Sequence, residues 1–138
     1  MTRLFILWDH SYSVGNVTID TQHQKFISII NELYESFVDQ TASQKLERII
    51  ADLIDYSKYH FQTEEDLFEK YNYPDKEEHI AKHKEFTLKI EEFKRDFESG
   101  KTNLTFQLMN YLRNWLLVHL KYEDQQYAGF LKAKGSSK

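Results

Sequence analysis

Residues 43–71, SQKLERIIADLIDYSKYHFQTEEDLFEKY, decide the fold. Buried-type side chains recur in this segment at spacings of three and four residues, which is the pattern of a helix with one buried face. The stripe consists of Leu46, Ile49, Ile50, Leu53, Ile54, Ser57, His60, Glu64, Leu67 and Phe68. Ser43 is a suitable N-cap, and the helix is expected to end before Asn72-Tyr73-Pro74, because a residue that precedes proline avoids the helical conformation. The last turns of the stripe hold a histidine and a glutamate where apolar side chains are expected.

The same periodicity recurs in three other parts of the chain. The expected segments are an arm at 1–19, helices at 20–38, 43–71, 75–98 and 103–121, and a tail at 122–138. Asp20 is the expected N-cap of the first helix, and Trp8 is expected to pack the non-helical arm on the body. A further helical turn is expected at 127–131. Four helices with short connections favour an all-α fold, an up-down-up-down antiparallel four-helix bundle in one domain.

Composition excludes several classes of function. One proline in 138 residues argues against a turn-rich β fold. The net charge of −4, without a basic stripe, excludes nucleic acid as a partner. The absence of cysteine excludes disulfides and thiolate metal sites. No apolar stretch approaches about 18 residues, and the apolar run in 1–8 is too short for a secretory signal, so we expect no membrane insertion and a cytoplasmic location. No surplus apolar seam is evident, so a monomer is expected.

Five of the six histidines and two carboxylates lie on or beside the expected apolar stripes. They are His23, His60, Glu64, His79, His83, His119 and Asp124. Taken alone, each motif is weak: His60-x-x-x-Glu64 is also an ordinary polar pair, and the two histidines of 79–83 share one helix face by chance in many proteins. His119 and Asp124, five residues apart, share a face only where the helix loosens or ends after His119.

A comparison of heights links these motifs. His23 and His60 lie about 18 and 19 residues from the first connection, near residue 41, which places both roughly 27 to 29 Å from it. His83 and His119 each lie about 18 residues from the third connection, near residue 101, and Glu64 and His83 lie about 10 from the second. All four helices therefore bring metal-ligating side chains to one layer of the bundle.

Such a layer would be costly to bury unpaired, and a metal removes that cost by taking the side chains as ligands. Seven protein ligands are too many for one ion, so two ions bridged by carboxylates fit better. Imidazole and carboxylate without sulfur suit iron, manganese or zinc.

The ordered set of His23, His60-x-x-x-Glu64, His79-x-x-x-His83 and His119-x-x-x-x-Asp124 resembles the complete ligand signature of the hemerythrin family. The stretches Ser13-Val14-Gly15 and Ile19-Asp20-x-x-His23, together with Trp8, are similar to the single-domain bacterial members, the bacteriohemerythrins. The resemblance extends from Trp8 to about Leu131. His10, in the arm, matches no ligand position.

This resemblance implies a role for each residue. His79, His83 and His119 would hold one iron, and His23 and His60 the other. Glu64 and Asp124 would bridge the two ions beside an oxo or hydroxo bridge, and O₂ would bind at the open position of the His23/His60 iron. Five residues are expected to line the O₂ cavity, although plain core packing explains each equally well: Phe26, Phe61, Trp115, Leu117 and Tyr122.

The expected function is reversible O₂ binding at a di-iron centre, for carriage, storage or local delivery to an O₂-consuming enzyme, and not catalysis. Five neutral imidazoles and two carboxylates carry less negative charge than a carboxylate-rich di-iron site, which disfavours high-valent iron. Sensing of O₂ or nitric oxide, iron storage and peroxide handling are alternatives at the same site. A ferritin-like di-iron enzyme is disfavoured because its Glu-x-x-His motifs are absent. A metal-free interaction module is also disfavoured, because the histidine pattern would then have arisen by chance.

Overall fold

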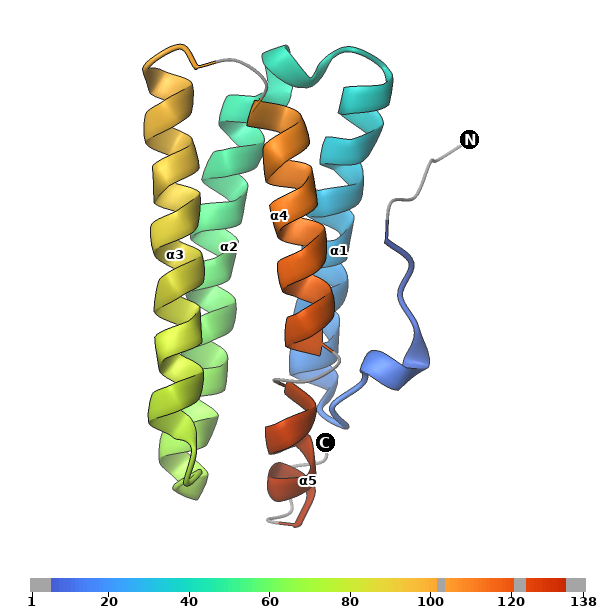
Figure 1. Cartoon of the computed structure of the whole chain (residues 1–138). Coiled ribbons are helices and arrows are strands. Elements are labelled where there is room, and N and C mark those ends of the chain that lie inside the picture. The colour runs from blue at the N-terminus through green and yellow to red at the C-terminus, as the bar shows by residue number, and fades with distance from the viewer. Residues whose placement is uncertain (1–5, 102–103, 121–123, 134–138) are drawn as a thin grey trace.

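A computed structural model describes residues 6–101, 104–120 and 124–133. The elements are a 3₁₀ turn, η1 (His10–Tyr12), and five helices, α1 (Val17–Val38), α2 (Ala42–Tyr71), α3 (Lys76–Glu98), α4 (Leu104–Val118) and α5 (Asp124–Ala133). Helices α1 to α4 run alternately up and down, and α5 lies below α4 at the end where α2 connects to α3 (Figure 1). The expected all-α antiparallel four-helix bundle, with an N-terminal arm and a short C-terminal helix, is confirmed.

The first helix begins earlier than the sequence predicted. It starts at Val17, not near Asp20, because the side chain of Asn16 caps it by accepting a hydrogen bond from the third helical N–H. Asp20 instead accepts hydrogen bonds from the Ser13 hydroxyl and the Val14 N–H, and so fastens the end of the arm to the first turn of α1. Asparagine and aspartate are comparable N-caps, so the sequence alone offered two starting points.

The bounds of α2 and α3 and the start of α4 lie within one residue of the expected ranges, whereas α5 (Asp124–Ala133) is longer than the turn expected at 127–131. At the end of α4 the chain widens into a π turn at 119–120, inside the range expected to be helical to residue 121 and at the point where the spacing of His119 and Asp124 required the helix to loosen. A π turn forms hydrogen bonds between residues five apart and is wider than an α-helical turn, so it suits two side chains spaced as His119 and Asp124 are. The helix therefore loosens after His119, as the five-residue spacing between His119 and Asp124 required. Residues 121–123, including Tyr122, lie outside the described residues.

The core consists of two apolar clusters. The larger one fills the bundle between α1, α2, α3 and α4 and includes Phe26, Phe61 and Phe86. The smaller one, with Phe68 and Tyr127, lies where α5 meets the bundle. Together they enclose a layer of polar side chains near one end.

The N-terminal arm is held against α1. The side-chain amide of Asn31 accepts a hydrogen bond from the Ile6 N–H and donates one to the Ile6 carbonyl, each 2.8 Å long. Trp8 packs against the larger cluster, as predicted. No helix among the described residues has both the length and the apolar character needed to cross a membrane.

Replacing Asn16 by alanine tests the assignment of the α1 cap. The variant loses the side-chain acceptor for the first turn, and we expect the free energy of unfolding to fall by about 1 kcal/mol in urea titrations. Thr18→Ala, at an exposed position of the same turn, is the matched control and should leave stability nearly unchanged. Equal effects of the two substitutions would show that Asn16 does not cap the helix.

Candidate metal centre

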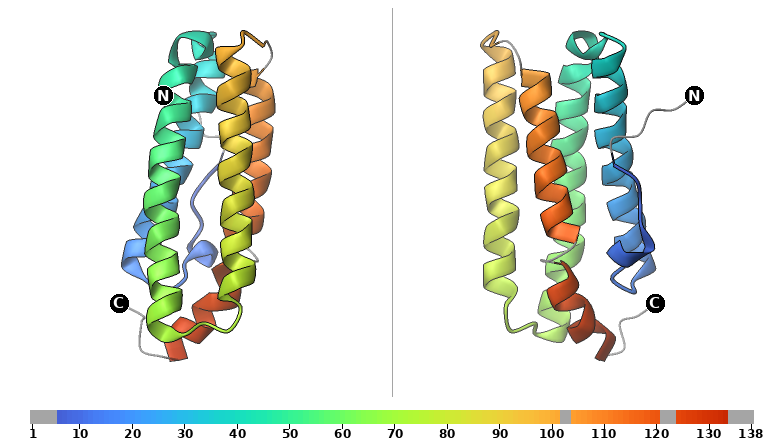
Figure 2. Two further views of the ribbon diagram at one scale, coloured as in Figure 1. Left: turned by 90° about the vertical axis from the view of Figure 1, so that its left-hand side faces the viewer. Right: turned by 45° about the vertical axis from the view of Figure 1, so that its right-hand side comes forward.

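All seven residues singled out from the sequence meet in one buried layer. They are His23 on α1, His60 and Glu64 on α2, His79 and His83 on α3, His119 in the π turn after α4, and Asp124 at the start of α5. Each is at most 4% exposed. The two views of Figure 2 show α5 turning below the end of α4, near the lower end of α2. Asp124 is the first residue of α5.

The ligand atoms form two adjoining groups, within each of which they lie no more than 4.8 Å apart. The first contains His23, His60, Glu64, His119 and Asp124, and the second contains Glu64, His79, His83 and His119. Glu64 and His119 belong to both. The ring of His119 lies 5.5 Å from that of His23 and 5.7 Å from that of His79, so its position does not favour one group over the other.

Both carboxylates lie between the histidines of the two groups. Asp124 places its oxygens 2.7 Å from Nε2 of His23 and 3.1 Å from Nε2 of His79. Glu64 Oε1 lies 2.9 Å from Nε2 of His83 and 3.6 Å from Nε2 of His60. Each carboxylate thus lies close to one histidine of the first group, His23 or His60, and to one histidine of the second group, His79 or His83. A ligand that bridges two ions requires this arrangement.

These short separations do not have the angles of well-formed hydrogen bonds. Although the atoms are close, Nε2 of His23, His60, His79 and His83, Oε1 of Glu64 and both oxygens of Asp124 have no hydrogen-bond partner with acceptable geometry among the described residues. Leaving so many buried polar atoms unsatisfied would cost several kcal/mol per group in an apolar interior, on the order of 2–7 kcal/mol for a neutral one. Converging donor atoms without partners are what a metal site presents before the ion is bound, so the donor set fits metal ions.

The protonation states also suit metal binding. Burial lowers the pKa of His60 to about 3, which leaves its imidazole neutral. Burial alone would raise the pKa of Glu64 and Asp124, but the surrounding histidines outweigh it and hold both values below their usual range. Burial opposes protonation of His79, yet Asp124 and Glu64 outweigh that effect and raise its pKa to about 9. Metal binding must therefore displace a proton from this part of the site.

Three supporting residues were not identified from the sequence. Gln22 Oε1 lies 2.7 Å from Nδ1 of His60, and Glu65 Oε2 lies 3.0 Å from Nδ1 of His83. An acceptor at Nδ1 keeps the proton there and turns the Nε2 lone pair toward the metal, which fixes both the tautomer and the ring orientation.

The third supporting residue is Tyr127, which is fully buried and donates a hydrogen bond to Glu64 Oε2. Burial, together with the nearby Asp124 and Glu64 carboxylates, raises the pKa of Tyr127 well above its ordinary value, so the hydroxyl keeps its proton and remains a donor. Tyr127 follows Asp124 by three residues, so the two side chains lie on the same face of one helix. This spacing is the sequence signal from which a position of Tyr127 near the site was predictable.

Aromatic rings surround the layer, and three of the residues expected near O₂ are among them. Phe61 stacks on the ring of His83 with centroids 3.9 Å apart, and Trp115 stacks on His119 at 4.6 Å. Phe26 meets His60 edge-on at 5.5 Å.

The fourth expected residue, Leu117, has a different environment. It is partly exposed, whereas Leu116 is fully buried in the cluster that contains Phe26 and Phe61. Leu116 precedes His119 by three residues and therefore shares its helix face. Leu117 precedes His119 by two residues and does not.

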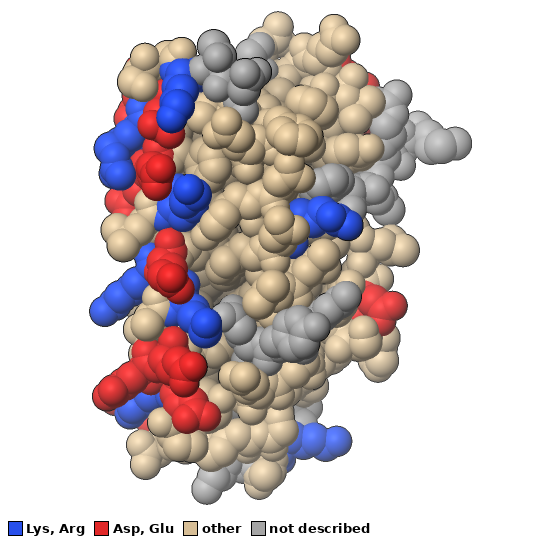
Figure 3. Space-filling view, viewed as in Figure 1, with Lys and Arg blue, Asp and Glu red and all other residues tan. Residues whose placement is uncertain are grey.

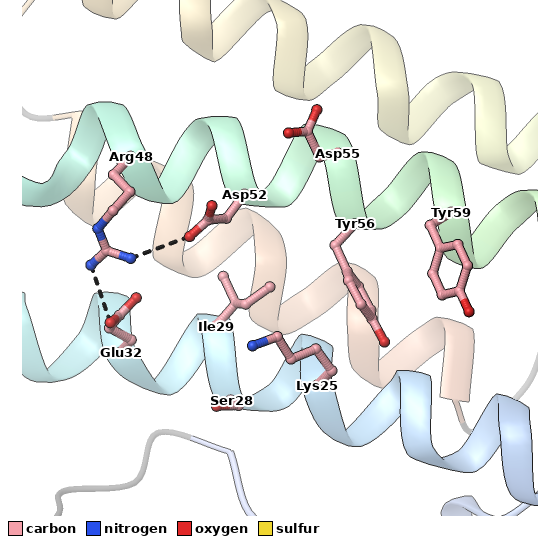
Figure 4. Close-up of a pocket in the computed structure, with 9 residues that line it drawn as sticks. All are labelled: Lys25, Ser28, Ile29, Glu32, Arg48, Asp52, Asp55, Tyr56 and Tyr59. Carbon is pink, nitrogen blue, oxygen red and sulfur yellow. Dashed lines mark hydrogen bonds and ion pairs between the residues drawn. The ribbon is translucent and has the colours of Figure 1, made fainter.

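A surface groove of about 400 Å³ lies between α1 and α2 (Figure 4). Arg48 forms a 3.2 Å ion pair there with Glu32, which links the two helices across exposed surface, and a second 3.2 Å ion pair with Asp52 on its own helix. Tyr56 lies in the groove and contacts Phe26 with ring centroids 5.4 Å apart. The groove is therefore separated from the metal layer by aromatic side chains and is not part of it.

The chain is similar to several known proteins along most of its length. Residues 14–131 match the family model described as "Hemerythrin HHE cation binding domain". A bacteriohemerythrin of Stenotrophomonas maltophilia is 32% identical over 93% of this chain and 82% of its own length. A hemerythrin-like protein of Naegleria gruberi is 32% identical over 90% of this chain and 92% of its own.

Among solved structures, a wild-type hemerythrin superposes with a TM-score of 0.83 at 22% identity, over 91% of this chain and 96% of that one. That likeness shows a shared fold, and the match over 14–131 shows the family. With its buried histidines and carboxylates in place, the chain belongs to the hemerythrin HHE cation-binding family.

Proposed function

We propose that the chain holds two iron ions and binds O₂ reversibly, for carriage, storage or local delivery. The observation that carries the proposal is the pair of adjoining, buried ligand groups, which two carboxylates link and in which Nε2 of His23, His60, His79 and His83 has no hydrogen-bond partner among the described residues. Relatives named as bacteriohemerythrins, similar along most of the chain, support it.

In this proposal His79 and His83 hold one ion, and His23 and His60 hold the other. Glu64 and Asp124 serve both, and His119, which lies between the groups, is assigned with His79 and His83. Imidazole and carboxylate without sulfur suit iron. Two ferrous ions in this place would supply the electrons for reversible O₂ binding. The chain contributes five neutral imidazoles and two carboxylates, a donor set with too little negative charge to favour high-valent iron.

The protein must also exclude water from this layer, because water promotes loss of the O₂-binding state. Phe26 and Phe61 cover His60 and His83 on the side of the larger cluster, and Trp115 covers His119. Leu116 belongs to the same cluster. In the proposal it takes the place of Leu117 in the lining of the O₂ cavity, because it is the leucine on the inner face of the helix.

The function is tested by optical spectroscopy of the iron-loaded, reduced protein. On exposure to O₂ we expect near-ultraviolet bands with a weaker visible band, all of which disappear when O₂ is removed and return when it is readmitted. Irreversible conversion to a ferric spectrum with peroxide release would instead indicate an oxidase or scavenger. One zinc ion per chain in a metal analysis would contradict the di-iron proposal altogether.

Removal of one ligand should cost the protein metal. We expect His79→Ala to contain fewer than two iron ions per chain by elemental analysis and to unfold at a lower temperature than the wild type, because its remaining ligands stay buried but incompletely coordinated. His10→Ala is the matched control, since His10 is exposed and lies in the arm. Full iron content in His79→Ala would refute the assignment of that ligand.

Leucines 116 and 117 provide a paired test of the O₂ cavity. We expect Leu116→Ala to lose the O₂-bound spectrum several-fold faster than the wild type because a cavity beside His119 admits water, at a stability cost of about 2–5 kcal/mol. Leu117→Ala, on the outer face, should change neither rate nor stability appreciably. Faster decay in Leu117→Ala alone would reverse the assignment of the two residues. Circular dichroism establishes that both variants are folded.

A further inference from the structure

A small notch lies at the surface where the start of α3 meets α5. It is lined by Tyr73, Asp75, Glu78, His79, Lys82 and Gln126. Its free space of about 10 Å³ is enough for one water molecule or one small ion and too little for an organic molecule. Figure 3 shows acidic side chains gathered over the lower part of α3, the end at which this helix begins.

Four of the lining residues share one face of α3. Asp75, Glu78, His79 and Lys82 occupy positions i, i+3, i+4 and i+7, which is the spacing of neighbours on a helix surface. Asp75 stands at the N-cap of α3, where an aspartate usually accepts a hydrogen bond from the first turn, but its side chain accepts none. Neither its carboxylate nor that of the exposed Glu78 forms a hydrogen bond or an ion pair within the described parts of the chain. Both are therefore available to a cation at the mouth of the notch.

The inner wall of the notch is a side chain of the buried layer. His79 is the most exposed of the seven at 4%, whereas the other six are at most 2% exposed. Its Nε2 has no hydrogen-bond partner among the described residues and lies 3.1 Å from Asp124 Oδ1 and 3.8 Å from Glu64 Oε1. One imidazole therefore borders both the notch and the layer.

Tyr73 also lines the notch, and its surroundings show how near the notch lies to the layer. Burial raises the pKa of Tyr73, and the carboxylates of Asp75, Glu78 and Asp124 raise it further. The hydroxyl of Tyr73 is thus close enough to feel both carboxylates at the mouth and one carboxylate of the layer. Only a short distance therefore separates the notch from Asp124.

We propose that ferrous iron enters and leaves the buried layer through this notch. The inference rests on the proposed function for the identity of the ion. Asp75 and Glu78 attract the hydrated cation and raise its concentration at the mouth. Carboxylate and imidazole are both ligands that suit iron, so the ion can pass from these oxygens to His79. Because Nε2 of His79 faces Asp124 and Glu64, the entering ion arrives beside the two carboxylates that serve both ions.

The larger grooves suit a cation less well. The groove of about 490 Å³ between α2 and α3 reaches His83, but Lys58 and Lys84 line it against a single carboxylate, that of Glu65. The lysines repel a divalent cation, and the ring of Phe61 covers the ring of His83. The groove between α1 and α2 is separated from the layer by aromatic side chains. In the notch, by contrast, two carboxylates face one lysine.

The route is tested by exchange of the bound iron for a stable iron isotope added as ferrous iron. The reduced, iron-loaded protein is incubated with the isotope in the absence of O₂ and separated from free iron, and its isotopic composition is measured by mass spectrometry. We expect Asp75→Asn and Glu78→Gln each to slow the exchange roughly three- to tenfold, because each removes an attractive charge from the path of a divalent cation. Lys82→Gln should accelerate the exchange, because it removes a repulsive charge.

Glu77→Gln is the matched control. Glu77 is an exposed carboxylate in the same first turn of α3 and does not line the notch, so its variant loses the same charge and should exchange iron at the wild-type rate. All four variants should retain two iron ions per chain, since none of them alters a side chain of the layer. Equal rates in the Asp75, Glu78 and Glu77 variants would overturn the route. Slower exchange in Lys82→Gln would also overturn it, because the rates would then follow a loss of structure and not the charge of the notch.

Iron content measured on the same samples separates this inference from the proposed function. Two iron ions per chain that exchange at a rate independent of Asp75 and Glu78 would refute the route and leave the proposed function standing. A chain that holds no iron would refute the proposed function, and the route for iron with it.

Discussion

The structure depends on one costly feature, a layer of seven polar side chains buried in an otherwise apolar interior. Most of their inward-facing atoms have no hydrogen-bond partner, although neighbouring atoms approach to 2.7 Å. An apolar core does not tolerate such a layer without compensation, because each buried polar group has lost its water. Metal ions would supply that compensation, and their binding free energy would then become part of the folding free energy. Under the proposed function, metal coordination at this layer therefore also stabilises the bundle.

The two apolar clusters on either side of the layer determine how rigidly the ligands are held. His83 stacks on Phe61 at one face and meets Glu65 at its outer nitrogen, so neither the ring plane nor the tautomer is free to change. His60 is fixed in the same way by Phe26 and Gln22. Packing sets the position of each ring, and an acceptor sets the direction of its lone pair. A site built this way is shielded as well as rigid, because each of the seven side chains is at most 4% exposed.

The convergence of the seven side chains was predictable from the sequence because helix geometry converts residue number into height and face. Equal distances from the connections placed His23 level with His60, and His83 level with His119, without knowledge of any contact. Gln22 and Glu65 were not predictable in this way, since each is adjacent in sequence to a ligand and its reach depends on how neighbouring helices are rotated. The prediction of Leu117, for which the proposed O₂ cavity substitutes Leu116, is a different case. An α-helix turns by about 100° per residue. The residue three positions before His119 therefore shares its helix face, and the residue two positions before it does not.

The π turn after α4 explains why the bundle needs a fifth helix. A continuous α-helix would carry Asp124 away from His119, so the chain widens at 119–120 and restarts as α5 with Asp124 in its first turn, where the helix dipole favours a carboxylate. The restarted helix must then be anchored, and Tyr127 anchors it by packing on Phe68 and donating a hydrogen bond to Glu64. One short helix therefore supplies one carboxylate of the site and orients the other. The docking of α5 closes the open end of the bundle. The geometry of the buried layer and the attachment of α5 therefore depend on the same contacts.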